Sequence, residues 1–260
     1  MLAAMNPIKP LKLRGHLGRF PLKGPMNILA EAESLLVGFE RSPAIRVSRA
    51  SGWHPDEADD YCRSCGQGTR PLWFSSSCSC VDGIGHPFSS VFRLGAYERP
   101  LSDWVCMVKF ERWNSMGEYL GRLMAEGLQV SVLNDESKGC IPLLVPVPMP
   151  RLRMISRGID HTRVLVEKIA AVTGWSTRRC LRQRAGRPQA SSTARQRAGR
   201  TNPFAWKGKP TSLEGRRVIL VDDVMTTGRT ARSATRILRA HGASEVTLAV
   251  IAVTESADRD

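Results

Sequence analysis

The second half of the chain alternates between two kinds of hydrophobic pattern. Largely apolar runs at residues 141–147, 217–222 and 246–253 have the length of buried strands. Apolar positions at helical spacing occupy residues 158–172 and 230–241. Strands that alternate with helices predict an α/β fold with a central parallel sheet and right-handed crossovers.

The first half carries weaker patterns. Helical spacing of apolar residues predicts a helix over residues 27–39 and a longer one over residues 99–128 that breaks near residues 112–115. Residues 1–25 combine prolines with scattered basic residues, which is typical of a flexible tail. Residues 182–202 are polar and basic, and we expect a loop or a mobile hood there.

These patterns divide the chain into four parts. A length of 260 residues suits one or two domains with a sizeable core. We expect an N-terminal extension over residues 1–50, a cysteine-rich module over 51–98, a helical connector over 99–140 and an α/β domain over 141–260.

The net charge of +14 comes from one segment. Residues 151–217 hold 17 Lys and Arg against 3 Asp and Glu, whereas the rest of the chain holds 21 of each sign. Such a segment favours an anionic partner: a nucleic acid, a phosphorylated small molecule or an acidic protein. A solvated arginine-rich surface without a partner is the alternative.

Composition excludes several classes of protein. Hydrophobic residues make up 42% of the chain and charged residues 24%, unlike a disordered or collagen-like chain. No run of about 18 apolar residues predicts a membrane span, and no apolar segment with a cleavage site follows the basic N-terminus. Seven cysteines, an odd number, fit a fully paired secreted framework poorly. We therefore expect a cytoplasmic protein.

Two adjacent carboxylates end the strand predicted over residues 217–222. Asp222 and Asp223 follow four apolar residues, and a short loop leads from them into the next predicted helix. Open α/β sheets bind ligands at the carboxyl ends of their strands, and the N–H groups at a helix N-terminus favour an anion. The carboxylates suit ligand hydroxyls or a divalent metal ion. The predicted phosphate-binding residues are Thr226, Thr227, Gly228, Arg229 and Thr230.

Each part of this motif has a simpler interpretation when it is taken alone. Asp223 could be an ordinary loop residue, and a threonine near the start of a helix is often an N-cap. The complete order of strand, acid pair, Thr/Gly loop and helix is much more specific than any of its parts, and it favours the phosphate site.

Four of the seven cysteines crowd into residues 62–80, as a Cys-x-x-Cys turn followed by a Cys-x-Cys pair. Thiolates suit tetrahedral Zn²⁺, so the pattern predicts one structural, zinc-ribbon-like site per chain. A disulfide or free thiols are the alternatives. The predicted ligands are Cys62, Cys65, Cys78 and Cys80, and the candidate substitutes are His54 and His86.

The run over residues 218–230 resembles the phosphoribosyl pyrophosphate (PRPP) signature of type I phosphoribosyltransferases. The resemblance implies the fold of that family, in which the central sheet is parallel. It implies that Asp222 and Asp223 are catalytic residues that contact the ribose hydroxyls, and that the loop holds the 5-phosphate. It also implies Mg²⁺ bound with PRPP, and charge stabilisation as pyrophosphate leaves C1.

Further segments resemble the ComF-type branch of these proteins, and the resemblance covers about residues 55–254. Residues 145–150 read Val-Pro-Val-Pro-Met-Pro, and residues 157–161 read Arg-Gly-Ile-Asp-His where the branch has Arg-Gly-Phe-Asn-Gln. An acid and an imidazole thus replace two amides. The other similar segments are Lys109-Phe110, Pro188-Gln189, Arg197 and Asn202-Pro203-Phe204.

Three arginines follow the first predicted strand of the α/β domain and are candidate ligands for the leaving pyrophosphate. A basic surface patch is the alternative interpretation. These residues are Arg151, Arg153 and Arg157.

Three functions from different classes follow from the resemblance. The first is a protein that binds PRPP or a related ribose 5-phosphate with Mg²⁺ and transfers a phosphoribosyl group. The second is a competence factor for DNA uptake, whose zinc module and basic segment bind single-stranded DNA, or whose partner is a competence helicase. The third is an adaptor that uses the scaffold for protein contacts alone.

Overall fold

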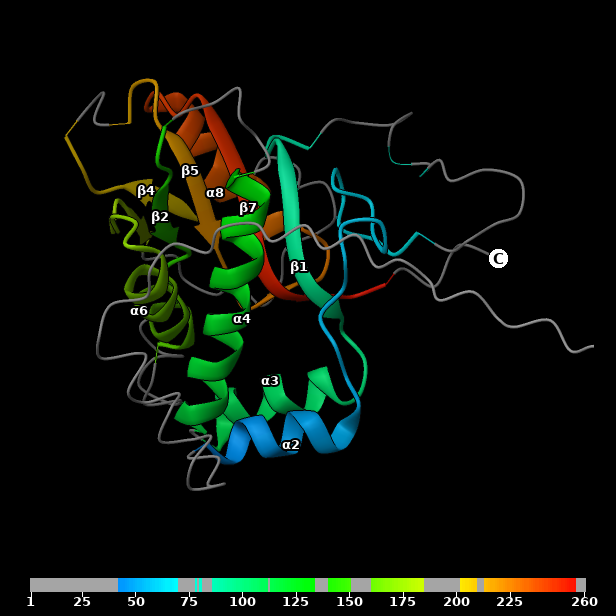
Figure 1. The fold of residues 1–260 in the computed structure, drawn as a ribbon. Helices are drawn as coiled ribbons and strands as arrows, with labels where there is room; N and C mark the ends of the chain where they lie inside the picture. Colours follow the sequence, from blue (N-terminus) through cyan, green and yellow to red (C-terminus); the bar gives the residue numbers. More distant parts are fainter. Residues whose placement is uncertain are drawn as a thin grey trace, which may run out of the picture. The chain divides into compact units, whose positions relative to one another are not determined.

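A parallel sheet ordered β1-β7-β5-β2 forms the centre of the computed structural model (Figure 1). The structure describes residues 42–69, 78, 80, 86–111, 113–133, 140–150, 160–184, 202–209 and 213–255. Every pairing in this sheet is parallel, which confirms the predicted α/β class. The strands are β1 (Ser90–Ala96), β2 (Leu143–Pro146), β5 (Arg217–Val221), β6 (Val224–Met225) and β7 (Glu245–Val253).

Helices lie on both faces of this sheet (Figure 1). The break predicted near residues 112–115 is confirmed, because one helix ends at Phe110 and the next begins at Asn114. Among the described helices, none is both long enough and apolar enough to cross a bilayer. The described helices are α2 (Pro43–Ser51), α3 (Leu101–Phe110), α4 (Asn114–Leu133), α6 (His161–Thr173) and α8 (Arg229–Ala240).

Alternate residues of β5 point into two separate hydrophobic clusters. On β5, Ile219 and Val221 pack with α3, α4 and α6, whereas Val218 and Leu220 pack with α8. A sheet covered on both faces explains why this strand reads as a continuous apolar run. A small antiparallel pair joins the α8 side and consists of β3 (Leu181–Gln183) and β4 (Phe204–Trp206).

The hydrophobic pattern did not predict β1, which lies within the stretch assigned to the cysteine-rich module. Arg93 and Gly95 interrupt its apolar run. Nevertheless β1 pairs with β7 along its length, and Arg93 is only 3% exposed. Arginine is almost never fully buried unless it is paired. An arginine within the apolar run therefore prevented the prediction of this strand from the sequence.

Several sequence expectations lie outside the described residues. These are the tail over residues 1–25, the helix over residues 27–39 and most of the predicted hood over residues 182–202. The described chain begins at residue 42, and helix α2 follows at once.

Candidate functional site

The acid pair lies at the carboxyl end of β5, as the sequence predicts. The Asp222 N–H donates to Ala249 O (3.0 Å) and the Ile251 N–H donates to Asp223 O (2.9 Å), so both acids are held to β7. The Asp222 carboxylate accepts from the Asp223 N–H at 2.9 Å, and the Asp223 carboxylate accepts from the Val224 N–H at 2.6 Å. The backbone thus fixes the orientation of both side chains.

A lysine from α3 completes the charge arrangement at this edge. Lys109 Nζ lies 3.0 Å from Asp223 Oδ2, and both side chains are largely buried. Burial, followed by the neighbouring Asp223 carboxylate, raises the pKa of Asp222. One acid of the pair therefore has a cationic partner, while the other has an environment that favours its protonated form.

The loop after the acids presents unused backbone donors. The N–H groups of residues 226–231 donate to no other described residue. The Arg232 side chain donates to Thr227 O at 2.5 Å, and the Arg232 N–H donates to Gly228 O at 2.8 Å, so the carbonyls are turned toward α8. Gly228 has φ +67°, a left-handed conformation that suits glycine. A loop of free N–H groups at a helix N-terminus can hold an anion.

The described residues contain only part of the predicted ligand set. Asp222, Asp223 and residues 226–230 are brought together at one edge of the sheet. The structure shows the role of Asp160, whose side chain accepts from the Arg163 N–H (3.2 Å) as the N-cap of α6. The segments outside the described residues are Arg151, Arg153, Arg157, Pro188-Gln189 and Arg197.

One end of the predicted hood is tied to the helix that follows the phosphate loop. The Asn202 side chain donates to Ser233 O at 2.7 Å and accepts from the Phe204 N–H at 3.0 Å. Asn202 therefore joins β4 to α8, which is a structural role for one residue of the hood segment.

The four clustered cysteines lie together, with all four sulfur atoms within 4.8 Å of one another. Cys62 and Cys80 Sγ are 3.5 Å apart, and Cys65 and Cys78 Sγ are 3.4 Å apart. These distances exceed a disulfide bond of about 2.05 Å and approach the sulfur separation of about 3.8 Å that tetrahedral Zn–S bonds of about 2.3 Å require. The donor set therefore fits a metal ion such as Zn²⁺.

Two thiols of this cluster, those of Cys65 and Cys80, have raised pKa values. Burial raises the pKa of Cys65 to about 11, and burial together with the neighbouring thiols also raises the pKa of Cys80. Neither predicted substitute ligand belongs to the cluster, since the described group consists of cysteines alone. His86 instead stacks on the Phe88 ring, with 4.8 Å between the ring centroids.

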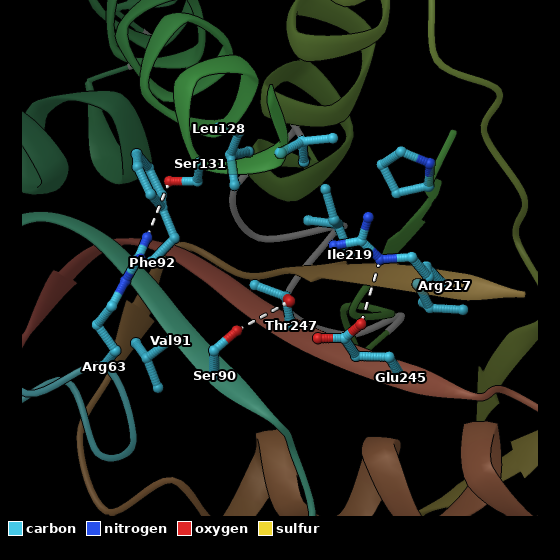
Figure 2. Close-up of a pocket in the computed structure, with 13 residues that line it drawn as sticks. Arg63, Ser90, Val91, Phe92, Leu128, Ser131, Arg217, Ile219, Glu245 and Thr247 are labelled. Atoms are coloured by element: carbon cyan, nitrogen blue, oxygen red, sulfur yellow. Dashed lines mark hydrogen bonds and ion pairs between the residues drawn. The ribbon is translucent and has the colours of Figure 1, made fainter. Parts of the chain in front are cut away.

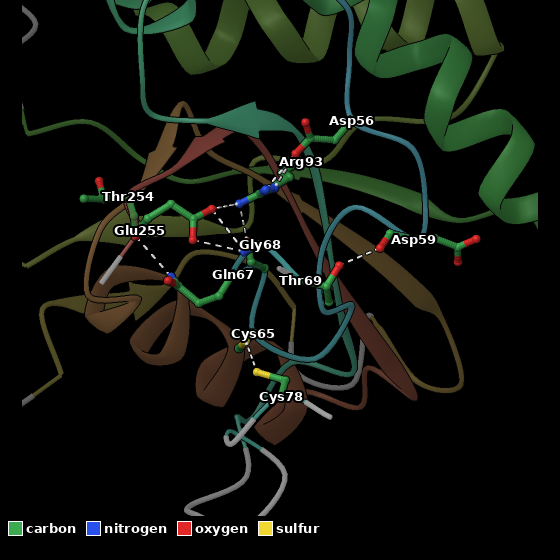
Figure 3. A network of polar contacts seen from close by, with 11 residues as sticks. Asp56, Asp59, Cys65, Gln67, Gly68, Thr69, Cys78, Arg93, Thr254 and Glu255 are labelled. Atoms are coloured by element: carbon green, nitrogen blue, oxygen red, sulfur yellow. Dashed lines mark hydrogen bonds and ion pairs between the residues drawn. The ribbon is translucent and has the colours of Figure 1, made fainter. Parts of the chain in front are cut away.

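A buried arginine connects the cysteine segment to the sheet (Figure 3). The Arg93 guanidinium donates to Gly66 O at 2.7 Å and forms ion pairs with Asp56 (2.7 Å) and Glu255 (2.6 Å). Glu255 also accepts from the Gly68 N–H at 3.0 Å. The sequence did not predict this network, because its members are far apart in the chain. The one hint in the sequence was an arginine within an apolar run.

Gly66, which follows Cys65, lies close to Met225, the residue before the predicted phosphate loop. A Cβ on Gly66 would lie 2.9 Å from Val91 Cγ1 and 3.2 Å from Met225 Cε. Met225 immediately precedes the loop, and its sulfur would lie 3.5 Å from a Cβ on Gly228. The Met225 side chain thus lies between Gly66 and Gly228.

Comparisons with known proteins agree with this geometry. A family model described as "Phosphoribosyl transferase domain" matches residues 177–259. The DNA utilization protein YhgH of Salmonella typhi is 30% identical over 166 residues, which are 62% of this chain and 70% of that protein. Competence protein ComFC of Streptococcus pneumoniae is 26% identical over 191 residues, or 73% of this chain and 74% of that protein.

Several solved structures show distant similarity. The glutamine PRPP amidotransferase of B. subtilis, solved in complex with ADP and GMP, matches with a TM-score of 0.35 and 22% identity. That match covers 52% of this chain and 25% of the amidotransferase.

The parallel sheet, the acid pair at its carboxyl edge and the matching family model define a phosphoribosyltransferase-type α/β domain. The four-cysteine cluster precedes it in the sequence. The chain belongs to the ComF/YhgH family of phosphoribosyltransferase-domain proteins.

Proposed function

We propose that the protein binds PRPP, or a related ribose 5-phosphate, at the carboxyl edge of the sheet. The loop over residues 226–231 supports this proposal most directly, because its N–H groups donate to no other described residue and it follows directly after an acid pair. Such a loop at a helix N-terminus can hold an anion. In this arrangement the loop N–H groups bind the 5-phosphate, and Asp222 and Asp223 accept hydrogen bonds from the ribose hydroxyls.

The donor set near the phosphate loop also fits Mg²⁺ bound together with the ligand. Two carboxylates lie at the strand end, and Mg²⁺ is bound in proteins by one or two carboxylates and substrate phosphates. When bound, Mg²⁺ neutralises charge on the diphosphate. Lys109 orients Asp223 through its ion pair.

Isothermal titration with PRPP and Mg²⁺ tests this function. We expect saturable heat with the full chain, and we expect its loss in the Asp222→Asn/Asp223→Asn variant. Asp103→Asn is the matched control, because Asp103 is a half-exposed acid on α3 that pairs with Arg99, which precedes the helix. Absence of heat with the unmodified protein, or equal binding by the double variant, would contradict the proposal.

We further propose a role in handling single-stranded DNA. The supporting observations are the similarity to a DNA utilization protein and to a competence protein, and the basic segment. Part of that segment is described, and it carries exposed cationic side chains around β3 and β4: Arg179, Arg182, Arg184, Lys207 and Lys209.

Binding of a single-stranded oligonucleotide at increasing salt tests this second role. The slope of log K against log salt is negative, and each phosphate contact that is lost should make it less steep by about 0.7. We expect the slope to become less steep in Arg182→Gln/Arg184→Gln. Arg122→Gln on the distant α4 should leave the slope unchanged. No binding at about 50 mM salt and micromolar protein would reject this role.

A further inference from the structure

A second cavity, of about 360 Å³, lies at the opposite edge of the sheet, where the strands begin (Figure 2). Its wall includes Ser90, Arg217 and Glu245, which are the first residues of β1, β5 and β7. Arg217 and Asp222 are separated by the whole of β5, which is roughly 16 Å of extended chain at about 3.3 Å per residue. This cavity is therefore distinct from the phosphate loop.

The lining of the cavity combines polar and apolar surface in about equal parts. Phe92 and Ile219 from the sheet and Leu128 from α4 form part of its lining (Figure 2). Ser90 Oγ and Thr247 Oγ1 lie 3.0 Å apart and form a hydroxyl pair at its wall. The volume falls within the range of about 300–1,000 Å³ that small-molecule sites occupy.

The charges of the lining residues do not cancel. Arg217 Nε lies 3.2 Å from Glu245 Oε2, so this pair is neutral overall. Arg63 donates to the neutral Ser131 hydroxyl at 3.1 Å and has no ion pair with a carboxylate of the described residues. Among the described residues, the exposed guanidinium of Arg63 therefore has no carboxylate partner, and its planar donors match a carboxylate or phosphate.

We propose that this cavity is a second ligand site, which binds a small organic anion with a flat apolar body. The anionic head, a carboxylate or a phosphate monoester, pairs with Arg63, and Ser131 holds the guanidinium in place. The apolar body lies against Phe92, Leu128 and Ile219. The Arg217–Glu245 ion pair lies at the end of the cavity where β5 and β7 begin.

Calorimetric titration of the full chain with 2-naphthoate and, separately, with 5′-dAMP tests the proposal. We expect saturable binding of at least one probe and about tenfold or more weakening in Arg63→Gln, because a charge-assisted contact is removed. Binding of naphthoate alone identifies the carboxylate class, and Arg63-dependent binding of dAMP alone identifies the phosphate class. Neutral 2-naphthamide should bind at least tenfold more weakly than naphthoate.

Variants separate this site from the phosphate loop and from general instability. Val132→Phe places a larger side chain in the cavity wall and should abolish probe binding without loss of the folded state. Arg122→Gln, the same charge change on the exposed surface of α4, should leave probe binding unchanged. Asp222→Asn/Asp223→Asn should also leave naphthoate binding unchanged, so failure of the PRPP proposal does not affect this test. No binding of either probe at about 5 mM, or equal binding by Arg63→Gln, would overturn the proposal.

Discussion

Lys109 and Asp223 form an ion pair at the carboxyl edge of the sheet, with 3.0 Å between Nζ and Oδ2. The lysine belongs to α3 and the acid follows β5, so the pair joins the helical part of the chain to the candidate phosphate site. Asp222 forms no ion pair with a described residue. The two acids of the motif therefore differ in their electrostatic surroundings although they are adjacent in sequence.

Removal of the lysine should destabilise the folded protein. We expect Lys109→Met to lower the free energy of unfolding by about 1–3 kcal/mol, because it leaves a largely buried carboxylate without its charged partner. Urea unfolding at neutral pH measures this change. Lys207→Met, at an exposed position, should change the free energy by less than about 0.5 kcal/mol. Equal stability of both variants would show that the pair contributes nothing.

Stability should fall as the pH rises toward 9. Burial and the Asp223 carboxylate raise the folded-state pKa of Asp222 to about 8 from its ordinary value of 3.8, so folding favours the protonated acid. This contribution is fully present below pH 3.8 and is lost as the pH rises through about 8. Unfolding free energies at a series of pH values should show the loss, and Asp222→Asn should remove it. An identical pH profile in the variant contradicts this explanation.

Metal analysis should find about one zinc ion per chain in protein purified without a chelator. We expect Cys65→Ser to lose the metal and to unfold at a lower temperature, because Cys65 is a buried member of the cluster. Cys106→Ser is the control, since Cys106 is exposed and lies outside the cluster. A metal-free wild-type protein would leave the four sulfur atoms as packed thiols.

Substitution of Gly66 should affect both stability and the phosphate loop. The Cβ of Gly66→Ala would meet Val91 at 2.9 Å and Met225 at 3.2 Å, and the position has φ +74°. Gly52→Ala shares the left-handed φ (+67°) but has nothing within 4 Å, so it measures the backbone strain alone, about 1–2 kcal/mol.

We expect Gly66→Ala to cost more than Gly52→Ala and, unlike it, to weaken PRPP binding through Met225. Chemical unfolding and calorimetric titration measure the two effects. Equal costs for the two variants would mean that the neighbours of Gly66 move aside freely.

The sequence predicted the parts of the fold whose signals are local. The apolar run before Asp222 and the helix after Gly228 were both predicted, because a doubly covered strand and an amphipathic helix have clear patterns. β1 was missed because Arg93 is satisfied by Asp56 and Glu255, which are distant in sequence. The free N–H groups of the phosphate loop also depend on where neighbouring carbonyls turn, and that is visible only in three dimensions.

The position of β7 has a consequence for the order of folding during synthesis. β7 lies between β1 and β5, yet it is the last described strand to leave the ribosome. Until residue 253 emerges, β1 lacks its partner in the sheet, and β5 is paired on only one side. The nascent chain therefore carries unpaired strand edges for most of its translation, a state that is prone to aggregation and that molecular chaperones protect.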